Sequence, residues 1–163
     1  MGGGSTGVRT VYSTHAGKGS YNNTIEDYEE KPKVFLSFSM RNKIQADLFR
    51  YQAEDDKYSL EFEDTSLKYP IENVNWHGPV GTKIEQSDVV IVFIGEDTHK
   101  RPAVNWEIRT AYQNDIPVIP VRVQKDRRFR LPSAIKRNGD YTVQWKLNEI
   151  QHRIEEVTKE KNS

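Results

Sequence analysis

Residues 88–95 read DVVIVFIG, an apolar run of six residues between an aspartate and a glycine. Such a run, without polar alternation, is typical of a strand buried on both faces at the centre of a parallel sheet. Residues 34–39, VFLSFS, form a second compact run just after Pro32. These two stretches predict the middle of a sheet with helices on both faces.

The segments around these strands alternate between helical and strand patterns. Residues 41–53 predict an amphipathic helix, because Ile44, Leu48 and Tyr51 recur at i, i+4 and i+7 and mark its apolar face. Further helices are predicted from residue 78, over 103–114 and over 147–159, and further strands over 59–63, 117–123 and 141–145. The alternation predicts an α/β fold with a five-stranded, mostly parallel sheet, and the length favours the flavodoxin-like strand order 2-1-3-4-5.

That strand order locates a small-molecule site. Its topological switch point is a crevice between the carboxyl ends of the first and third strands. Residues 38–41 (FSMR) and 95–98 (GEDT) follow those two strands. We therefore expect any ligand to bind between these two loops.

The N-terminal segment differs from the rest of the chain. Residues 1–31 open with GGGS, close on an acidic run, and show no period of 2 or 3.6 among their apolar residues. They predict a flexible tail, or one that Tyr12, Tyr21 and Tyr28 pin to the domain or to a second copy. Residues 32–163 are then the folded α/β domain.

Composition excludes several classes of protein. The 163 residues include 24 Lys and Arg against 24 Asp and Glu, so the net charge is zero, and there is no cysteine. Zero net charge argues against a nucleic-acid-coating protein, and a basic cluster at Lys125, Arg127, Arg128 and Arg130 is interpreted as a solvated loop. No run is long enough to span a membrane, and none near the start resembles a secretory signal, which predicts a cytoplasmic protein. The four histidines lack metal-ligand spacing, so no metal site is expected.

Two motifs resemble a known family. The opening strand, VFLSFS, resembles that of TIR domains, and residues 87–108, SDVVIVFIGEDTHKRPAVNWEI, are similar to the TIR-like family of the Thoeris antiphage systems. Members of that family have a strand ending in Ile-Gly, a threonine three residues later (Thr98), and an aromatic–Glu–Ile helix start (Trp106, Glu107). The resemblance implies a flavodoxin-like TIR fold.

The resemblance also implies an activity. Active TIR enzymes cleave NAD⁺, here as substrate and not as cofactor, into ADP-ribose-derived signalling nucleotides for a downstream effector. Glu107 is the catalytic residue that the match implies. TIR enzymes usually carry tryptophan four residues before this glutamate, where this chain has Ala103. This departure keeps open the alternative of a non-catalytic scaffold that assembles other proteins.

The remaining site residues follow from the crevice and the family match. Glu107 falls at the margin of the apolar stripe of its helix, where a carboxylate suits stabilisation of an oxocarbenium-like transition state. The expected substrate-binding residues are Phe38, Ser39, Asp64, Ser66, Thr98 and Trp106. Helical spacing also places Trp106, Arg109 and Gln113 on the face opposite the apolar stripe, which predicts that Trp106 is exposed or, alternatively, buried under the preceding loop. We expect that face, or the tail, to support a homo-oligomer.

Overall fold

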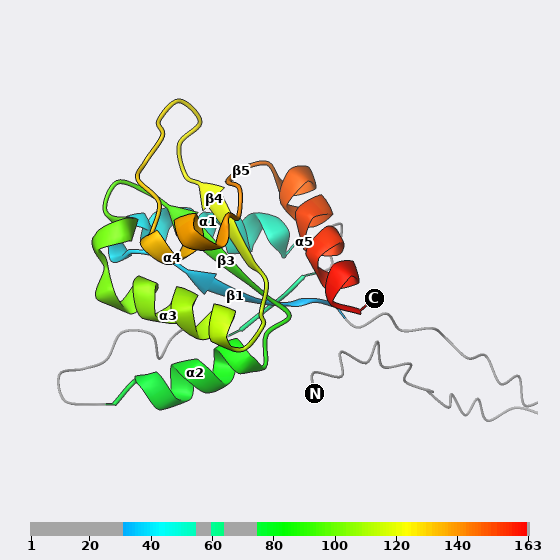
Figure 1. Ribbon diagram of the computed structural model, residues 1–163. Helices are drawn as coiled ribbons and strands as arrows, with labels where there is room; N and C mark the ends of the chain where they lie inside the picture. The colour runs from blue at the N-terminus through cyan, green and yellow to red at the C-terminus, as the bar shows by residue number, and fades with distance from the viewer. Residues whose placement is uncertain (1–30, 55–59, 64–74, 163) are drawn as a thin grey trace, which may run out of the picture. The chain divides into compact units, whose positions relative to one another are not determined.

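The computed structural model describes residues 31–54, 60–63 and 75–162. In this part of the chain, helices cover both faces of a central sheet (Figure 1). The strands are β1 (Lys33–Ser37), β2 (Glu61–Phe62), β3 (Val89–Ile94), β4 (Val118–Arg122) and β5 (Val143–Gln144). The α-helices are α1 (Lys43–Ala53), α2 (His77–Glu85), α3 (Pro102–Gln113), α4 (Ser133–Asn138) and α5 (Leu147–Asn162), with short 3-10 turns η1 (Met40–Asn42) and η3 (Thr98–Lys100).

The sheet has the predicted order, β2-β1-β3-β4-β5, and every neighbouring pair is parallel. The fold class is thus confirmed. Strand β3 lies at the centre, with all six residues buried. The edge strands β2 and β5 are two residues long, shorter than predicted. Pro120 fits inside β4 because β5 pairs only beyond it, with Val121 and Arg122.

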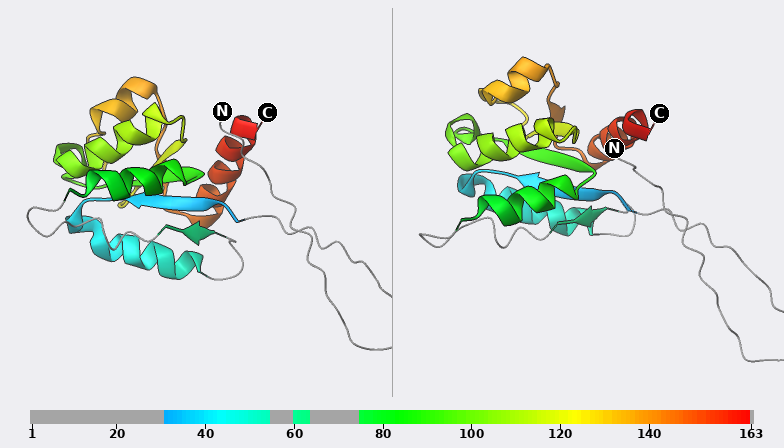
Figure 2. Two further views of the ribbon diagram at one scale, coloured as in Figure 1. Left: turned by 90° about the horizontal axis from the view of Figure 1, so that it is seen from below. Right: turned by 60° about the horizontal axis from the view of Figure 1, so that its bottom comes forward.

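Helices lie on both faces of the sheet (Figure 2), and alternation along β3 divides the core into two layers. Val89, Ile91 and Phe93 pack in the cluster that includes residues of α1 and α5, whereas the even-numbered residues pack in the cluster of α2, α3 and α4. Because successive strand residues point to opposite faces, an unbroken apolar run is what a strand between two helical layers requires. Each fully buried valine or isoleucine contributes about 1.5–3 kcal/mol.

The predicted apolar face of α1 is wrong. Ile44 and Tyr51 are 80% and 77% exposed, and the residues that α1 buries are Ala46, Phe49 and Ala53. The buried face depends on one aromatic side chain, because the Phe49 ring makes edge contacts with the rings of Phe62, Phe93 and Trp145 at centroid distances of 5.4–6.5 Å. Helix α1 is therefore apolar on two faces, and the face predicted from the sequence pattern is the exposed one.

Helix α4 was not predicted. It supplies the crossover that joins β4 to the parallel β5, and it ends at Gly139, whose φ of 80° is the left-handed conformation that glycine adopts most readily. Ile135 is its fully buried anchor. Six residues with one buried side chain are too few to show a helical period, which explains the omission.

The predicted tail, residues 1–31, lies outside the described residues apart from Lys31. Its proposed roles stay predictions. Among the helices that the structure describes, none combines the length and the apolar character needed to cross a membrane.

Candidate functional site

Glu107 lies inside the protein, against the end of β1. Helix α3 follows β3 and packs on the sheet, and its inner face carries Glu107 with Val104 and Ile108. The Ser37 hydroxyl donates to Glu107 Oε1 at 3.4 Å, and both side chains are fully buried. Removing a carboxylate from water costs free energy that ordinary packing does not return. A fully buried glutamate is uncommon, and such a group is a candidate for a functional role.

The two loops at the switch point are linked by Ser39 and Asp97. Ser39 Oγ accepts from the backbone N–H of Arg41, and its hydroxyl also interacts with Asp97. The Arg101 guanidinium donates to Asp97 Oδ2 through Nε at 2.7 Å and through Nη2 at 2.5 Å. Burial raises the pKa of Asp97, but the hydrogen bonds from Arg101 and Ser39 and the charges of Arg101 and Arg41 outweigh it, so the pKa lies below its usual value.

Asn42 directly follows the loop after β1 and approaches Gly95 of the loop after β3. Its side chain is 6% exposed, and its Oδ1 is buried and accepts no hydrogen bond from the described residues. A Cβ added at Gly95 would lie 2.4 Å from that oxygen, so only glycine allows this approach. A buried carbonyl oxygen without a donor has the capacity to accept from the hydroxyl or amide of a ligand.

The predicted substrate-binding residues have different surroundings. Thr98 Oγ1 accepts from Gly95 N at 2.8 Å and donates to the Phe93 carbonyl at 3.0 Å, so its hydroxyl organises the loop after β3. Phe38 is 5% exposed and packs in the α1–α5 core. Asp64 and Ser66 lie outside the described residues. Ligand contact by these four residues stays a prediction.

Exposure, one of the two alternatives predicted for Trp106, is wrong. Trp106 is half-buried against α2, where its ring lies edge-on to the rings of Trp76 and His77 at centroid distances of 5.1 and 4.8 Å. The space above Gly81 is so tight that a Cβ there would meet the indole at 3.4 Å. The spacing of α3 identifies the face turned from the sheet but does not show that α2 covers part of it. Arg109 and Gln113 are exposed as predicted.

Sequence reasoning did not single out Ser37, Asn42, Asp97 or Arg101. Ser37 belongs to a strand that reads as apolar, and Asn42 lies at the start of a helix where polar residues are ordinary. Asp97 and Arg101 are four residues apart, a spacing that also describes any exposed helical ion pair. The usable signal was the position of Asp97 after the central strand.

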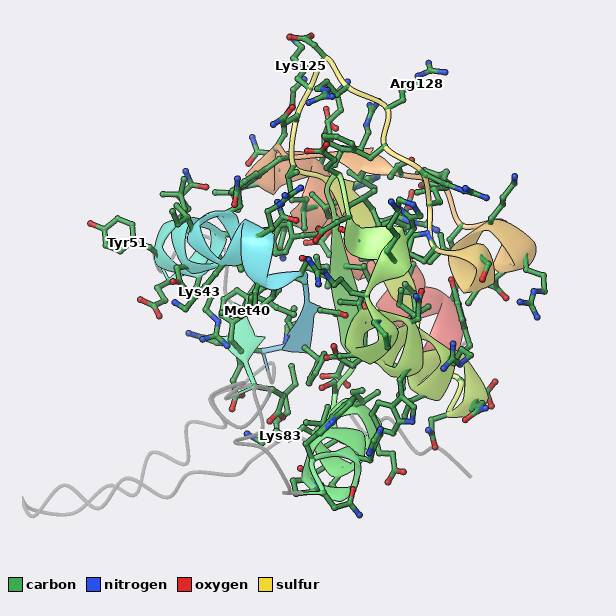
Figure 3. All side chains as sticks on the ribbon, turned by 90° about the vertical axis from the view of Figure 1, so that its left-hand side faces the viewer. Met40, Lys43, Tyr51, Lys83, Lys125 and Arg128 are labelled. Atoms are coloured by element: carbon green, nitrogen blue, oxygen red, sulfur yellow. The ribbon has the colours of Figure 1, made fainter. Side chains whose placement is uncertain are left out.

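The basic cluster lies in the loop between β4 and α4, where Figure 3 labels Lys125 and Arg128. Its four cations are exposed, and Arg127 stacks over the Phe129 ring at 5.2 Å. Within the described ranges, no group of three or more His, Asp or Glu side chains is arranged to hold a metal ion.

The arrangement combines three features at the carboxyl ends of β1 and β3. A buried carboxylate, a buried amide oxygen without a donor, and an ion-paired aspartate lie on or behind the two loops. All three are acceptors of hydrogen bonds or stabilisers of positive charge. The site thus suits a ligand that bears hydroxyl groups and develops a cation during reaction.

Comparison with known proteins identifies a family for this chain. A sequence model of the family described as Thoeris protein ThsB, TIR-like domain, matches residues 35–128, more than half of the chain. Among curated proteins, no sequence matches.

Two solved structures have similar folds. The TIR domain of the Toll-related receptor TRR-2 from Hydra magnipapillata has a TM-score of 0.53 at 12% identity, over 78% of this chain and 92% of that one. The CMP N-glycosidase BcmB from Clostridium botulinum has a TM-score of 0.49 at 15% identity, over 76% and 97%. At these identities the likeness to the Hydra domain shows the fold alone, and the likeness to BcmB is too low to bear on function.

Proposed function

The chain belongs to the family of TIR-like domains of the Thoeris protein ThsB, and from this premise we propose that it cleaves NAD⁺ between nicotinamide and ribose, with Glu107 as the catalytic carboxylate. The observation that carries the proposal is the burial of Glu107 beside Ser37, at the carboxyl end of β1. Ligands of open parallel sheets bind at that edge. A costly buried carboxylate at that edge is a candidate catalytic group.

The reaction needs a negative charge near the ribose, and it does not need a general acid. Cleavage breaks the bond between ribose C1′ and the pyridinium nitrogen, and the bonding electrons leave with nicotinamide as a neutral molecule. The ribose becomes an oxocarbenium-like cation, which the Glu107 carboxylate stabilises while water or a hydroxyl of the same nucleotide attacks C1′ and loses its proton. A carboxylate in a site without bulk water opposes this charge more strongly than one at the surface.

Glu107 is fully buried, so turnover requires that neighbouring side chains move apart to admit the ribose. Ser39 and Asp97 are also buried, on the two loops, and the same movement would bring them into contact with the substrate and let Asn42 Oδ1 accept from it. The nucleotide product would act on a downstream effector.

A second candidate function is a non-catalytic scaffold. Ala103, at the position where TIR enzymes usually carry tryptophan, favours it.

The two functions are separated by incubating the protein with NAD⁺, with and without extract of phage-infected cells, and resolving the nucleotides by chromatography. Cleavage predicts one nicotinamide released for each ADP-ribose-type product. An NAD⁺ pool that stays constant under both conditions would support the scaffold and reject catalysis.

A further inference from the structure

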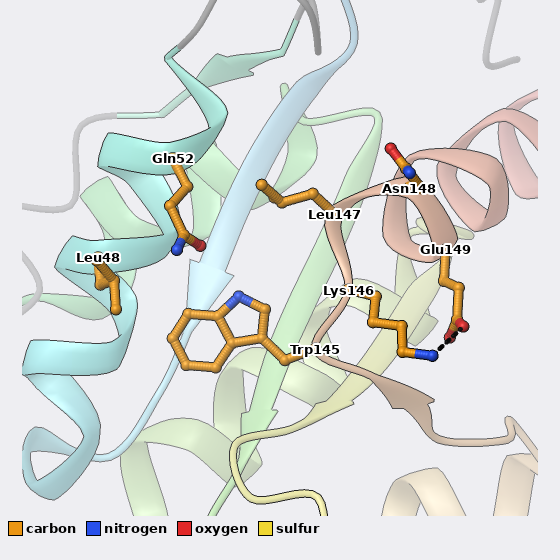
Figure 4. A pocket seen from close by; sticks show the side chains of 7 residues that line it. All are labelled: Leu48, Gln52, Trp145, Lys146, Leu147, Asn148 and Glu149. Carbon is orange, nitrogen blue, oxygen red and sulfur yellow. Dashed lines mark ion pairs between the residues drawn. The ribbon is translucent and has the colours of Figure 1, made fainter.

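Several cations at the carboxyl end of the sheet have a partner within the chain. Arg41, after β1, pairs with Glu96 at 3.4 Å. Lys146, after β5, pairs with Glu149 at 3.3 Å beside the groove between α1 and α5 (Figure 4). A carboxylate of the chain opposes the charge of each of these side chains, so they do not indicate a site for an external anion.

The end of β4 and the loop that follows it are different. Residues 122–131 contain five cations against one acid, Asp126, in a chain whose net charge is zero. The name β4 cations is used below for Arg122, Lys125, Arg127, Arg128 and Arg130. No carboxylate in the described part of the chain forms an ion pair with any of them. Their charge is therefore available to an anion from outside the chain.

Arg122 is the β4 cation that belongs to the sheet itself. It is the last residue of β4 and is only partly exposed. Its Nε is buried and donates to no acceptor among the residues that the structure describes. Removing a charged N–H group from water without giving it an acceptor costs free energy. The oxygens of a phosphate would satisfy this group, because a guanidinium matches phosphate with two parallel hydrogen bonds.

Arg122 lies on the same face of the sheet as Glu107. Side chains alternate along β4, and Val118, four residues earlier, packs in the cluster of α2, α3 and α4. Through β3, the strand register places Pro120 level with Ser37, the residue that contacts Glu107. A strand spacing of about 4.8 Å and a rise of about 3.3 Å per residue then place the Cα atoms of Ser37 and Arg122 about 12 Å apart. One face of the sheet thus offers a carboxylate and a guanidinium to different parts of one ligand.

Apolar residues hold the loop after β4 on this face. Phe129 and Leu131 pack against the core cluster of α2, α3 and α4, and α3 is the helix that carries the candidate catalytic residue. The Arg127 guanidinium lies 5.2 Å from the centre of the Phe129 ring, so an anchored side chain supports it. Figure 3 shows Lys125 and Arg128 at the outer end of the loop. The loop therefore extends the positive charge outward from Arg122.

We propose that the β4 cations bind the diphosphate of a nucleotide whose ribose lies at Glu107, with Arg122 as the residue that positions it. In NAD⁺ the diphosphate is joined to the nicotinamide ribose through the 5′ carbon, so the two groups lie close together in the same molecule. The carboxylate opposes the cation that develops on the ribose, and the guanidinium binds the negative end of the ligand. This inference deepens the proposed function, and it rests on that function for the identity of the nucleotide.

A nucleic acid is the other polyanion that a basic loop can bind. Arg122 favours a nucleotide, because its Nε is buried at the end of a strand, where a small ligand reaches more easily than a polymer backbone. The chain as a whole has no surplus of positive charge. Binding that depends on displaced counterions requires such a surplus over a long surface.

The test is isothermal titration calorimetry of the full chain at low salt, with ADP-ribose and with adenosine, which lacks the phosphates. We expect ADP-ribose to bind about tenfold or more tightly than adenosine. Arg122→Met should weaken ADP-ribose binding about tenfold or more, without changing adenosine binding, and Arg122→Lys should recover part of the loss. Arg137→Met, at the exposed end of α4, is the matched control and should bind ADP-ribose as the wild type does.

A second variant tests the loop without disturbing the sheet. Arg127 and Arg128 are exposed, so the double variant Arg127→Glu and Arg128→Glu should keep the melting temperature of the wild type. Its affinity for ADP-ribose should fall about threefold or more, and the dissociation constant should depend less steeply on salt.

Three results would overturn the proposal. They are a folded Arg122→Met protein that binds ADP-ribose as the wild type does, ADP-ribose binding no tighter than that of adenosine, and tighter binding of a short single-stranded DNA than of ADP-ribose. Failure of the proposed function is a separate result, because binding requires no turnover. A chain that binds ADP-ribose through Arg122 and leaves NAD⁺ intact would support this inference and reject cleavage. An Arg122→Met protein that cleaves NAD⁺ with the wild-type KM would do the reverse.

Discussion

Substitution of Gly95 by alanine should destabilise the fold through one identified contact. The new Cβ would lie 2.4 Å from Asn42 Oδ1 and 2.9 Å from both Cγ and Nδ2, well inside van der Waals contact. Asn42 is 6% exposed, so its amide must shift within the packed interior to make room for the new Cβ. Overpacking of this kind costs about 1–3 kcal/mol, and we expect a loss of about 2 kcal/mol in the free energy of unfolding. Urea unfolding followed by circular dichroism measures it.

The same contact predicts a rescue. In an Asn42→Ala background the obstructing amide is gone, so adding Gly95→Ala should cost less than about 0.5 kcal/mol beyond Asn42→Ala alone. Gly78→Ala is the control, because nothing lies within 4 Å of its added Cβ, and in α2 it should stabilise by about 0.5–1 kcal/mol. An equal loss from Gly95→Ala in both backgrounds would refute the reasoning.

Three further substitutions test other contacts. Because the folded pKa of Asp97 is depressed, its stabilisation is present above its unfolded pKa and is lost as pH falls through the folded pKa. Arg101→Met should therefore lower the free energy of unfolding at neutral pH by about 1 kcal/mol and move the acid unfolding midpoint to higher pH in a circular dichroism titration. Burial, together with the hydrogen bond to Asp140 and its charge, raises the pKa of Tyr112 above its usual 10.0, so its stabilisation falls as pH rises beyond that value. Tyr112→Phe should cost about 1.5 kcal/mol at pH 7 and flatten this alkaline loss, as measured by urea unfolding at several pH values. Gly139→Ala should cost about 1–2 kcal/mol in the same assay, because φ is 80° there.

The sheet was predictable because the unbroken apolar sequence of its central strand indicates burial on both faces. A strand between two helical layers has no solvent face, so the apolar run Val89–Ile94 admits few other structures. Helix α1 was harder. Apolar residues recur at helical spacing on both of its faces. Only the packing of Phe49 against three other rings decides which face is buried. Information of that kind lies in the neighbouring elements and not in the helix.

The candidate site, like the fold, could be predicted from the sequence only in part. Glu107 was found because a carboxylate beside an apolar stripe conflicts with ordinary packing, and the family motif lies around it. Its contact with Ser37 joins residues 70 positions apart, and no local pattern encodes such a pair. The covering of Trp106 by α2 depends on the packing of two helices, and the spacing of residues within α3 does not show it.

The most direct test of the proposed function compares the wild type with Glu107→Gln in the NAD⁺ assay. Glutamine keeps the size and the acceptor for the Ser37 hydroxyl but removes the charge that opposes the oxocarbenium ion. We expect turnover to fall by about 100-fold or more, the scale of losing one electrostatic stabiliser, with a melting temperature close to that of the wild type. A folded Glu107→Gln protein that cleaves NAD⁺ at the wild-type rate would contradict the role of Glu107 in the reaction.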